Sequence, residues 1–298
     1  MVHASFGEAG SSADHERASA GRLLRMVRRS FEVGHRIVRL LLATLILGIS
    51  AQTLSAAVLT DAAAKAYAEY VDRARRSFLG RVNQPVGAGD SERAALHREE
   101  MTVRPGGGDG IQELPDSLLH HWRGAVFIPR ITLQESLTVS RAYPDYPTIF
   151  HPVVAAKVLS DEGDALRVQF RMRQSAGGIT GTLDMWSNIQ YGRLDPTHAS
   201  VISTTDTIRE VKDAGRSTER YVPEGQDRGY LWRGATFTRF VEADGGVYME
   251  METIGLSRRF PPLLGWVIEP IARRIGRGSV ENSMQEFRRA VLARQPVR

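Results

Sequence analysis

Polar and apolar residues alternate through most of the chain between residues 120 and 256, the pattern of half-buried β-strands. In Leu166–Arg173 every apolar side chain falls on one face of such a strand and every polar one on the other. Val247, Met249 and Met251 alternate with more polar neighbours in the same way. Short turns such as Asp161–Asp164 separate the runs. The pattern predicts strands at 120–128, 152–160, 164–173, 179–191, 199–210, 229–241 and 246–256.

The period changes from two residues to about 3.6 outside these runs, which predicts helices. A helix is expected over Asp61–Gly80, capped by its first residue, and a short one over Thr132–Arg141. The chain ends with helical periodicity over Leu263–Ile275 and Val280–Arg294, and we expect a break or kink at Gly276–Gly278. The helix at Asp61–Gly80 either packs on the domain or lies on a membrane surface, and the sequence leaves both placements open.

Glycine and proline are frequent between residues 81 and 112, most densely in Pro105–Gly110. This composition predicts a flexible linker, with one helical turn near 91–100. The predicted organisation has a leader at 1–57, a helix with its linker at 58–112 and a folded domain at 113–298.

Six arginines lie between residues 22 and 39, and the following Leu40–Leu59 holds no charged residue. A basic region, an apolar core of about ten residues and a small-residue end at Ser55, Ala56 and Ala57 are typical of a cleaved secretory signal peptide. An uncleaved anchor is the alternative, because about twenty uncharged residues span a bilayer, and a buried helix is a third reading. Cleavage is favoured by the polar second half of the run. Signal or anchor, the domain is expected outside the cytoplasm, either exported or held at the inner membrane.

Composition and motifs exclude several kinds of chemistry. The net charge is +5, and the arginines are spread along the chain, so no nucleic-acid interface is predicted. The chain has no cysteine, which excludes disulfides and thiolate chemistry. No nucleophile elbow or phosphate-binding loop occurs, and no catalytic residue is assigned. His120 and His121 are adjacent and should face opposite sides of a strand, so neither a metal site nor a cofactor is predicted.

Among the carboxylates on predicted strands, four are candidates for chemistry: Asp184, Asp206, Glu250 and Glu252. They would support acid–base chemistry only if two of them met in a cavity. The alternation places Glu250 and Glu252 opposite Met249, so these two are expected to face solvent.

The order of elements predicts an α+β fold, in which a strand and a short helical pair precede a meander of six strands and a terminal helix. Within it, Ser136–Val158 places Asp145, Tyr146 and Pro152 between a helix and a strand. This order, over roughly residues 118–297, resembles the START-like (SRPBCC, helix-grip) superfamily, and most nearly its coenzyme-Q-binding and polyketide cyclase-like members. The resemblance implies a curved antiparallel sheet of about seven strands that grips a long C-terminal helix. The N-terminal export segment, helix and linker depart from most cytosolic relatives.

Members of this superfamily bind apolar ligands between the sheet and the long helix, and the resemblance implies the same here. Arg233 and Arg239 share a strand face and are candidate polar contacts, with surface salt bridges as the alternative. The alternation selects residues expected to face the cavity, with plain core packing as the alternative for each: Val168, Phe170, Met172, Leu183, Met185, Met249, Met251 and Trp266.

The sequence therefore favours a non-catalytic binder or carrier of a hydrophobic small molecule, such as a lipid, a quinone or a polyketide-like ring. One alternative is a structural or interaction module of the cell envelope with a filled core. The other is a cyclase- or hydrolase-like enzyme, which requires a cluster of ionisable groups in the same cavity.

Overall fold

The computed structural model describes residues 58–298 except 88, 99, 177–178, 260–264 and 295–298, and it leaves out the side chains of 174–180, 265–268 and 271. The leader and the proposed cleavage region at Ser55, Ala56 and Ala57 lie outside the described residues. None of the helices within the described part combines the length and the apolar character needed to cross a bilayer.

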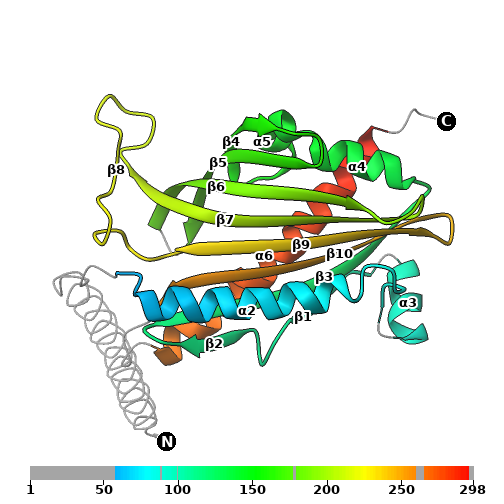
Figure 1. Cartoon of the computed structure of the whole chain (residues 1–298), viewed down its shortest axis with the longest axis horizontal. Coiled ribbons are helices and arrows are strands. Elements are labelled where there is room, and N and C mark those ends of the chain that lie inside the picture. The colour runs from blue at the N-terminus through cyan, green and yellow to red at the C-terminus, as the bar shows by residue number, and fades with distance from the viewer. Residues whose placement is uncertain (1–57, 88, 99, 177–178, 260–264, 295–298) are drawn as a thin grey trace, which may run out of the picture. The chain divides into compact units, whose positions relative to one another are not determined.

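From Ala56 onward the chain forms one compact unit around a ten-stranded antiparallel sheet. The strand order is β1-β3-β10-β9-β7-β6-β5-β4, with β2 paired to β3 and β8 paired to β7 (Figure 1). The long strands are β3 (Ser117–Pro129), β4 (Val153–Asp161), β5 (Ala165–Ala176), β6 (Ile179–Arg193), β7 (His198–Lys212), β9 (Arg233–Ala243) and β10 (Gly246–Arg258). The short ones are β1 (Thr102–Pro105), β2 (Ile111–Leu114) and β8 (Arg220–Tyr221).

The helices are α2 (Asp61–Leu79), α3 (Asp90–His97), α4 (Leu133–Arg141), α5 (Tyr146–Ile149) and α6 (Gly265–Ala293), with a 3-10 turn η1 at Tyr143–Asp145. The predicted α+β class, the curved antiparallel sheet and the long C-terminal helix are confirmed. All seven long strands coincide with predicted ones. The alternation missed β1, β2 and β8, because runs of two to four residues are too short to show a period.

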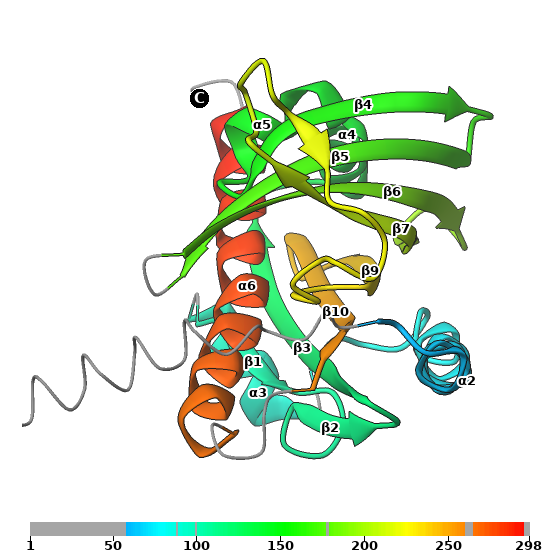
Figure 2. The same cartoon turned by 90° about the vertical axis from the view of Figure 1, so that its left-hand side faces the viewer.

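The sheet is covered on both faces (Figure 2). We call the face that packs against α4, α5 and α6 the inner face and the face that packs against α2 and α3 the outer face. On the inner face, Val126 and Met249 pack with Met284 of α6. On the outer face, Phe78 of α2 packs with Phe237 at a ring separation of 5.4 Å. The alternating strand positions therefore have different partners on the two faces.

Helix α2 packs on the outer face of the sheet, which is one of the two placements left open by its sequence. Tyr67 is buried there and its hydroxyl donates to the carbonyl oxygen of Ile254 at 3.3 Å. The cap is Thr60 and not Asp61, because the Thr60 hydroxyl accepts from the backbone N–H of Ala63 at 3.2 Å.

The segment expected to be a flexible linker is instead part of the sheet and its cover. It contains α3, β1 and β2, and the compact unit begins at Ala56 and not near residue 112. Its glycines serve a tight turn between β1 and β2: Gly110 has φ +96°, and a Cβ there would lie 2.4 Å from the Trp122 ring. High glycine content here reflects close packing.

Helix α6 is continuous across Gly276–Gly278, where the sequence predicted a break. Gly276 lies against the indole of Trp122, and a Cβ at this position would be 2.5 Å from Trp122 Nε1. The glycine is therefore explained by the close approach of the helix to β3. Around Gly278 nothing lies within 4 Å of the corresponding Cβ position.

These two glycines allow a matched test of the helix contact. Gly278→Ala is expected to raise the free energy of unfolding by about 0.5–1 kcal/mol, because alanine favours a helix. Gly276→Ala is expected to lower it by about 1 kcal/mol, because the clash with Trp122 outweighs that gain. Urea denaturation of both variants measures the difference, and an equal gain in both would show that α6 does not press on Trp122.

Candidate functional site

Strand register defines the layout of the inner face, because cross-strand partners in an antiparallel sheet share a face. Phe170 of β5 lies opposite Met185 of β6, which lies opposite Ile208 of β7. Met172 and Leu183 form the next pair on the same face. All five side chains are half-buried, and we call them the apolar patch. Half-burial leaves part of their apolar surface available to a ligand.

Next to the apolar patch, two rows of small and hydroxyl-bearing residues cross the inner face, and we call them the polar rows. The first row, from β6 to β3, is Ser187, Thr205, Gly234, Gly255 and His120. The second row, from β7 to β10, is Ser203, Thr236 and Thr253. Ser187 and Thr205 are buried and hydrogen-bonded to each other at 2.8 Å, and the remaining members are half-buried.

Few atoms pack against Gly234 in the first polar row. A Cβ at Gly234 would meet only the side chain of Thr205, at 3.7 Å, which is an ordinary contact. Helix α6 instead packs close to β3 further along the sheet, where a Cβ at Gly124 would be 2.4 Å from Met284 Cε. The helix is thus drawn to one side of the inner face.

His120 ends the first polar row. Its Nε2 lies 2.8 Å from the hydroxyl oxygen of Ser257. Burial lowers the pKa of His120 to about 4, so the ring is neutral at pH 7. The adjacent His121 points to the outer face, as the sequence predicted for neighbouring strand residues. Within the described part, no three His, Asp or Glu side chains are grouped as a metal site.

The structure places the sequence-predicted cavity residues in three settings. Val168 and Met249 are packed into core clusters with 0% and 2% exposure. Met251 is half-buried at the margin of the core beneath α6, and the side chain of Trp266 lies outside the described residues. The other four belong to the apolar patch: Phe170, Met172, Leu183 and Met185.

Both candidate arginines lie on the outer face, away from the apolar patch. Arg239 is 2% exposed and donates from Nε and Nη2 to the carboxylate of Glu250, at 3.2 Å each. Its Nη1 donates to the carbonyl oxygens of Arg81 and Gln84, at 2.5 and 2.6 Å. Arg233 is half-buried and donates to the carbonyl oxygen of Trp232 at 2.8 Å.

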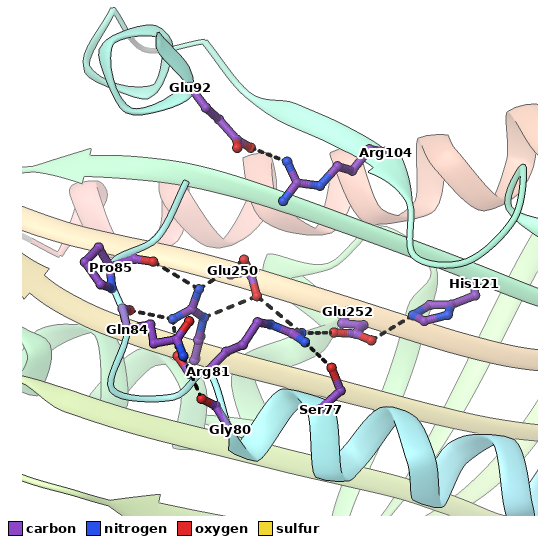
Figure 3. Close-up of polar contacts among 11 residues, drawn as sticks. Ser77, Gly80, Arg81, Gln84, Pro85, Glu92, Arg104, His121, Glu250 and Glu252 are labelled. Carbon is purple, nitrogen blue, oxygen red and sulfur yellow. Dashed lines mark hydrogen bonds and ion pairs between the residues drawn. The ribbon is translucent and has the colours of Figure 1, made fainter. Parts of the chain in front are cut away.

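The prediction that Glu250 and Glu252 face solvent is wrong, because both are 3% exposed. Their strand face was predicted correctly, but α2 and the residues after it cover that face (Figure 3). Arg81 donates to Glu252 at 2.6 Å, and His121 Nε2 lies 2.8 Å from the same carboxylate. Burial raises the pKa of Glu252, but the hydrogen bond to His121 and the nearby arginines outweigh burial and hold this pKa below its usual range.

The other two candidate carboxylates also lie on the outer face. Asp184 is fully buried and accepts two hydrogen bonds from Arg171, at 2.7 and 2.8 Å. It also accepts from the hydroxyl of Tyr221 at 2.9 Å. Asp206 is exposed and pairs with Arg167 at 2.9 Å. The arrangement that acid–base chemistry requires, two carboxylates together on the inner face, is therefore not formed by these four.

A hollow of about 440 Å³ lies between α4 and the ends of β6 and β7, where Arg141, Tyr191 and Arg193 line it. A packed cluster that includes Tyr143 and Ile189 separates it from the polar rows. Its volume is therefore not continuous with the apolar patch.

Comparison with known proteins finds similarity to solved structures. No family model matches the chain, and no curated protein matches it. Human StAR-related lipid transfer protein 5 is similar at 12% identity, with 77% of this chain and 98% of that chain covered and a TM-score of 0.44. In fold, the chain is similar to START-like proteins.

Two bacterial structures are similar to the chain to the same degree. A STAR-related lipid transfer protein from Xanthomonas axonopodis is 12% identical over 64% of this chain and 98% of its own, at a TM-score of 0.41. A START superfamily protein from Mycobacterium smegmatis is 8% identical over 59% and 99%, at 0.40. At these identities the likeness extends to the fold alone.

Sequence reasoning missed the polar rows and Ile208. Thr236 and Thr253 alternate with apolar residues as the patch residues do, but alternation alone does not show which threonines from different strands become neighbours. Register supplies that information, and it depends on hairpin geometry.

The buried pair on the outer face can be tested through stability. Arg239→Met is expected to lower the free energy of unfolding by about 3 kcal/mol, because it removes the main partner of a buried Glu250. The double variant Arg239→Met/Glu250→Met is expected to recover more than half of that loss, since no unpaired charge remains. Chemical denaturation measures both.

The exposed pair of Arg76 and Asp72 provides the control. Arg76→Met is expected to change stability by less than about 0.5 kcal/mol, because exposed ion pairs contribute little. A double variant that is no more stable than Arg239→Met alone would show that the loss comes from the backbone contacts of Arg239 and not from the stranded carboxylate.

Proposed function

We propose that this chain binds a hydrophobic small molecule on the inner face of its sheet, between the apolar patch and the polar rows. The observation that carries the proposal is the half-burial of five adjacent apolar side chains on the inner face, beside the polar rows. Where α6 covers the sheet, Met249 is almost completely buried. In the apolar patch, Phe170 packs against the rings of Tyr143 and Tyr146. The other four side chains belong to none of the packed core clusters of the described residues.

Ligand contact with the apolar patch would remove apolar surface from water, and this transfer contributes about 25 cal/mol per Å². The apolar patch contains Met172, Met185 and Phe170. The methionine thioethers and the phenylalanine ring adapt to irregular apolar shapes. Gly234 leaves room beside them. The site is therefore suited to binding, and the four strand carboxylates that would support catalysis lie elsewhere.

Substitution of Gly234 by a larger side chain tests the proposed site. Gly234→Leu is expected to occupy the space beside Gly234 while the fold is retained. We therefore expect it to reduce binding of the neutral fluorescent probe Nile red by at least about tenfold. The matched control is Lys157→Leu, which places the same side chain at an exposed position of β4 on the opposite face. Fluorescence titration of the full chain gives both affinities.

Equal loss in the two variants would contradict binding at the inner face. Failure of the wild-type chain to bind Nile red, together with native mass spectrometry that finds no co-purified apolar molecule, would contradict the proposed function itself. The filled-core interaction module would then be favoured.

We further propose that the domain acts outside the cytoplasm, on the basis of the basic and apolar pattern of residues 22–59. The full chain with a C-terminal tag is expected in the periplasmic or membrane fraction of a Gram-negative host. N-terminal sequencing of the mature protein is expected to begin just after the region of Ser55, Ala56 and Ala57 if a signal peptide is removed. An unprocessed chain in the cytoplasmic fraction would refute export.

A further inference from the structure

We infer that the ligand of the inner face is an electrically neutral molecule that carries hydroxyl or carbonyl oxygens beside its apolar part. This inference rests on the proposed function and specifies the chemical class of the ligand. The observation behind it is that the polar rows lie next to the apolar patch. The two features meet on β6 and β7, where they occupy neighbouring positions.

The hydroxyls of the second polar row are available to a ligand. Ser203, Thr236 and Thr253 are half-buried, and their side chains have no hydrogen-bond partner among the residues that the structure describes. A plain hydrocarbon bound over them would take water away from these hydroxyls and offer nothing in return, which costs free energy. A ligand oxygen placed at the row replaces the lost water.

His120 adds a second kind of polar contact at the end of the first row. One ring nitrogen is held by Ser257, and the other, Nδ1, has no partner within the described part of the chain. A neutral imidazole can donate or accept through this nitrogen, depending on its tautomer. It therefore fits either a carbonyl or a hydroxyl.

Charge on the inner face argues against an ionised ligand. Neither the apolar patch nor the polar rows contain Lys, Arg, Asp or Glu. The nearest acid by register is Glu210, opposite Leu183, and it accepts from the backbone N–H of Arg228 at 2.9 Å. The guanidinium of Arg228 also pairs with Glu210 at 3.5 Å, so the charges of these two residues already offset each other. Burial keeps His120 neutral. A carboxylate or phosphate buried here would have no counter-ion, and an unpaired buried charge is very costly.

The spacing of the rows sets the scale of the ligand. Successive residues on one face of a strand are about 7 Å apart, so the two polar rows lie about 7 and 14 Å from the Phe170–Met185–Ile208 row. A compact molecule of two or more fused rings can reach both the patch and a polar row at once.

Three probes with one skeleton test the inference: 2-methyl-1,4-naphthoquinone, 2-methylnaphthalene and 2-naphthoate. The quinone carries neutral carbonyl oxygens, the hydrocarbon lacks them, and naphthoate is an anion at pH 7. The chain has no cysteine to which the quinone could add covalently. In equilibrium dialysis of the full chain, the quinone is expected to bind about tenfold or more tightly than either other probe.

The double variant Thr236→Val/Thr253→Val removes two hydroxyls at nearly constant shape. It is expected to reduce quinone binding about tenfold. It is also expected to strengthen methylnaphthalene binding, because the hydrocarbon no longer takes water from two hydroxyls. Thr204→Val, a hydroxyl removed from the outer face by the same change, is expected to alter neither affinity.

The outcomes separate the two proposals. If the hydrocarbon binds as tightly as the quinone, or if naphthoate binds best, the inference is overturned while the proposed function stands. Unchanged preference for the quinone in the double variant also overturns it, because the oxygens would then be recognised elsewhere. If none of the three probes binds while Nile red still binds, the inference is overturned and the proposed function stands; if Nile red and all three probes fail to bind, both proposals fail.

Discussion

The ion pairs that fix the segment after α2 to β9 and β10 determine how the two faces of the sheet are used. Arg81 and Arg239 meet Glu250 and Glu252 on a surface from which water is almost excluded. Buried pairs of this kind add little net stability, but an unpaired member is costly. The network therefore determines the position of α2, while Phe78 and its apolar neighbours stabilise the packing. With α2 in place, the outer face has no room for a ligand among these residues.

On the inner face, the position of helix α6 is determined differently, by side chains that pack directly against glycines. The side chain of Met284 packs against Gly124 of β3, and the indole of Trp122 packs against Gly276 of α6. The absence of a Cβ at both glycines lets the helix lie very close to β3. Contacts this tight on one side hold α6 away from β5, β6 and β7. The five side chains of the apolar patch on those strands remain half-buried for a geometric reason, although they are as apolar as the side chains of the core.

How far the sequence predicts this structure depends on the range of the interaction involved. Alternation is local, and it predicted all seven long strands and the face on which Glu250 lies. What covers a face is not local, and so the same glutamate was expected in solvent. Gly276 was interpreted as a helix break because its partner, Trp122, is far away in sequence. The polar rows were missed because they join residues of five strands, and only register brings them together.

The threonines of the second polar row bear on the choice between a filled core and a binding face. Valine has the same shape as threonine and an equal preference for strands, and it would close a core without a hydroxyl to satisfy. Thr236 and Thr253 nevertheless lie opposite each other on the inner face, next to Ser203. Where the core is filled, as around Met249 and Phe240, the same strands carry mainly apolar side chains, and the buried Thr238 is an exception. The hydroxyls of the second polar row lie where α6 leaves the inner face half-buried. Hydroxyls in such a place can bond to a polar atom, either water or the oxygen of a ligand.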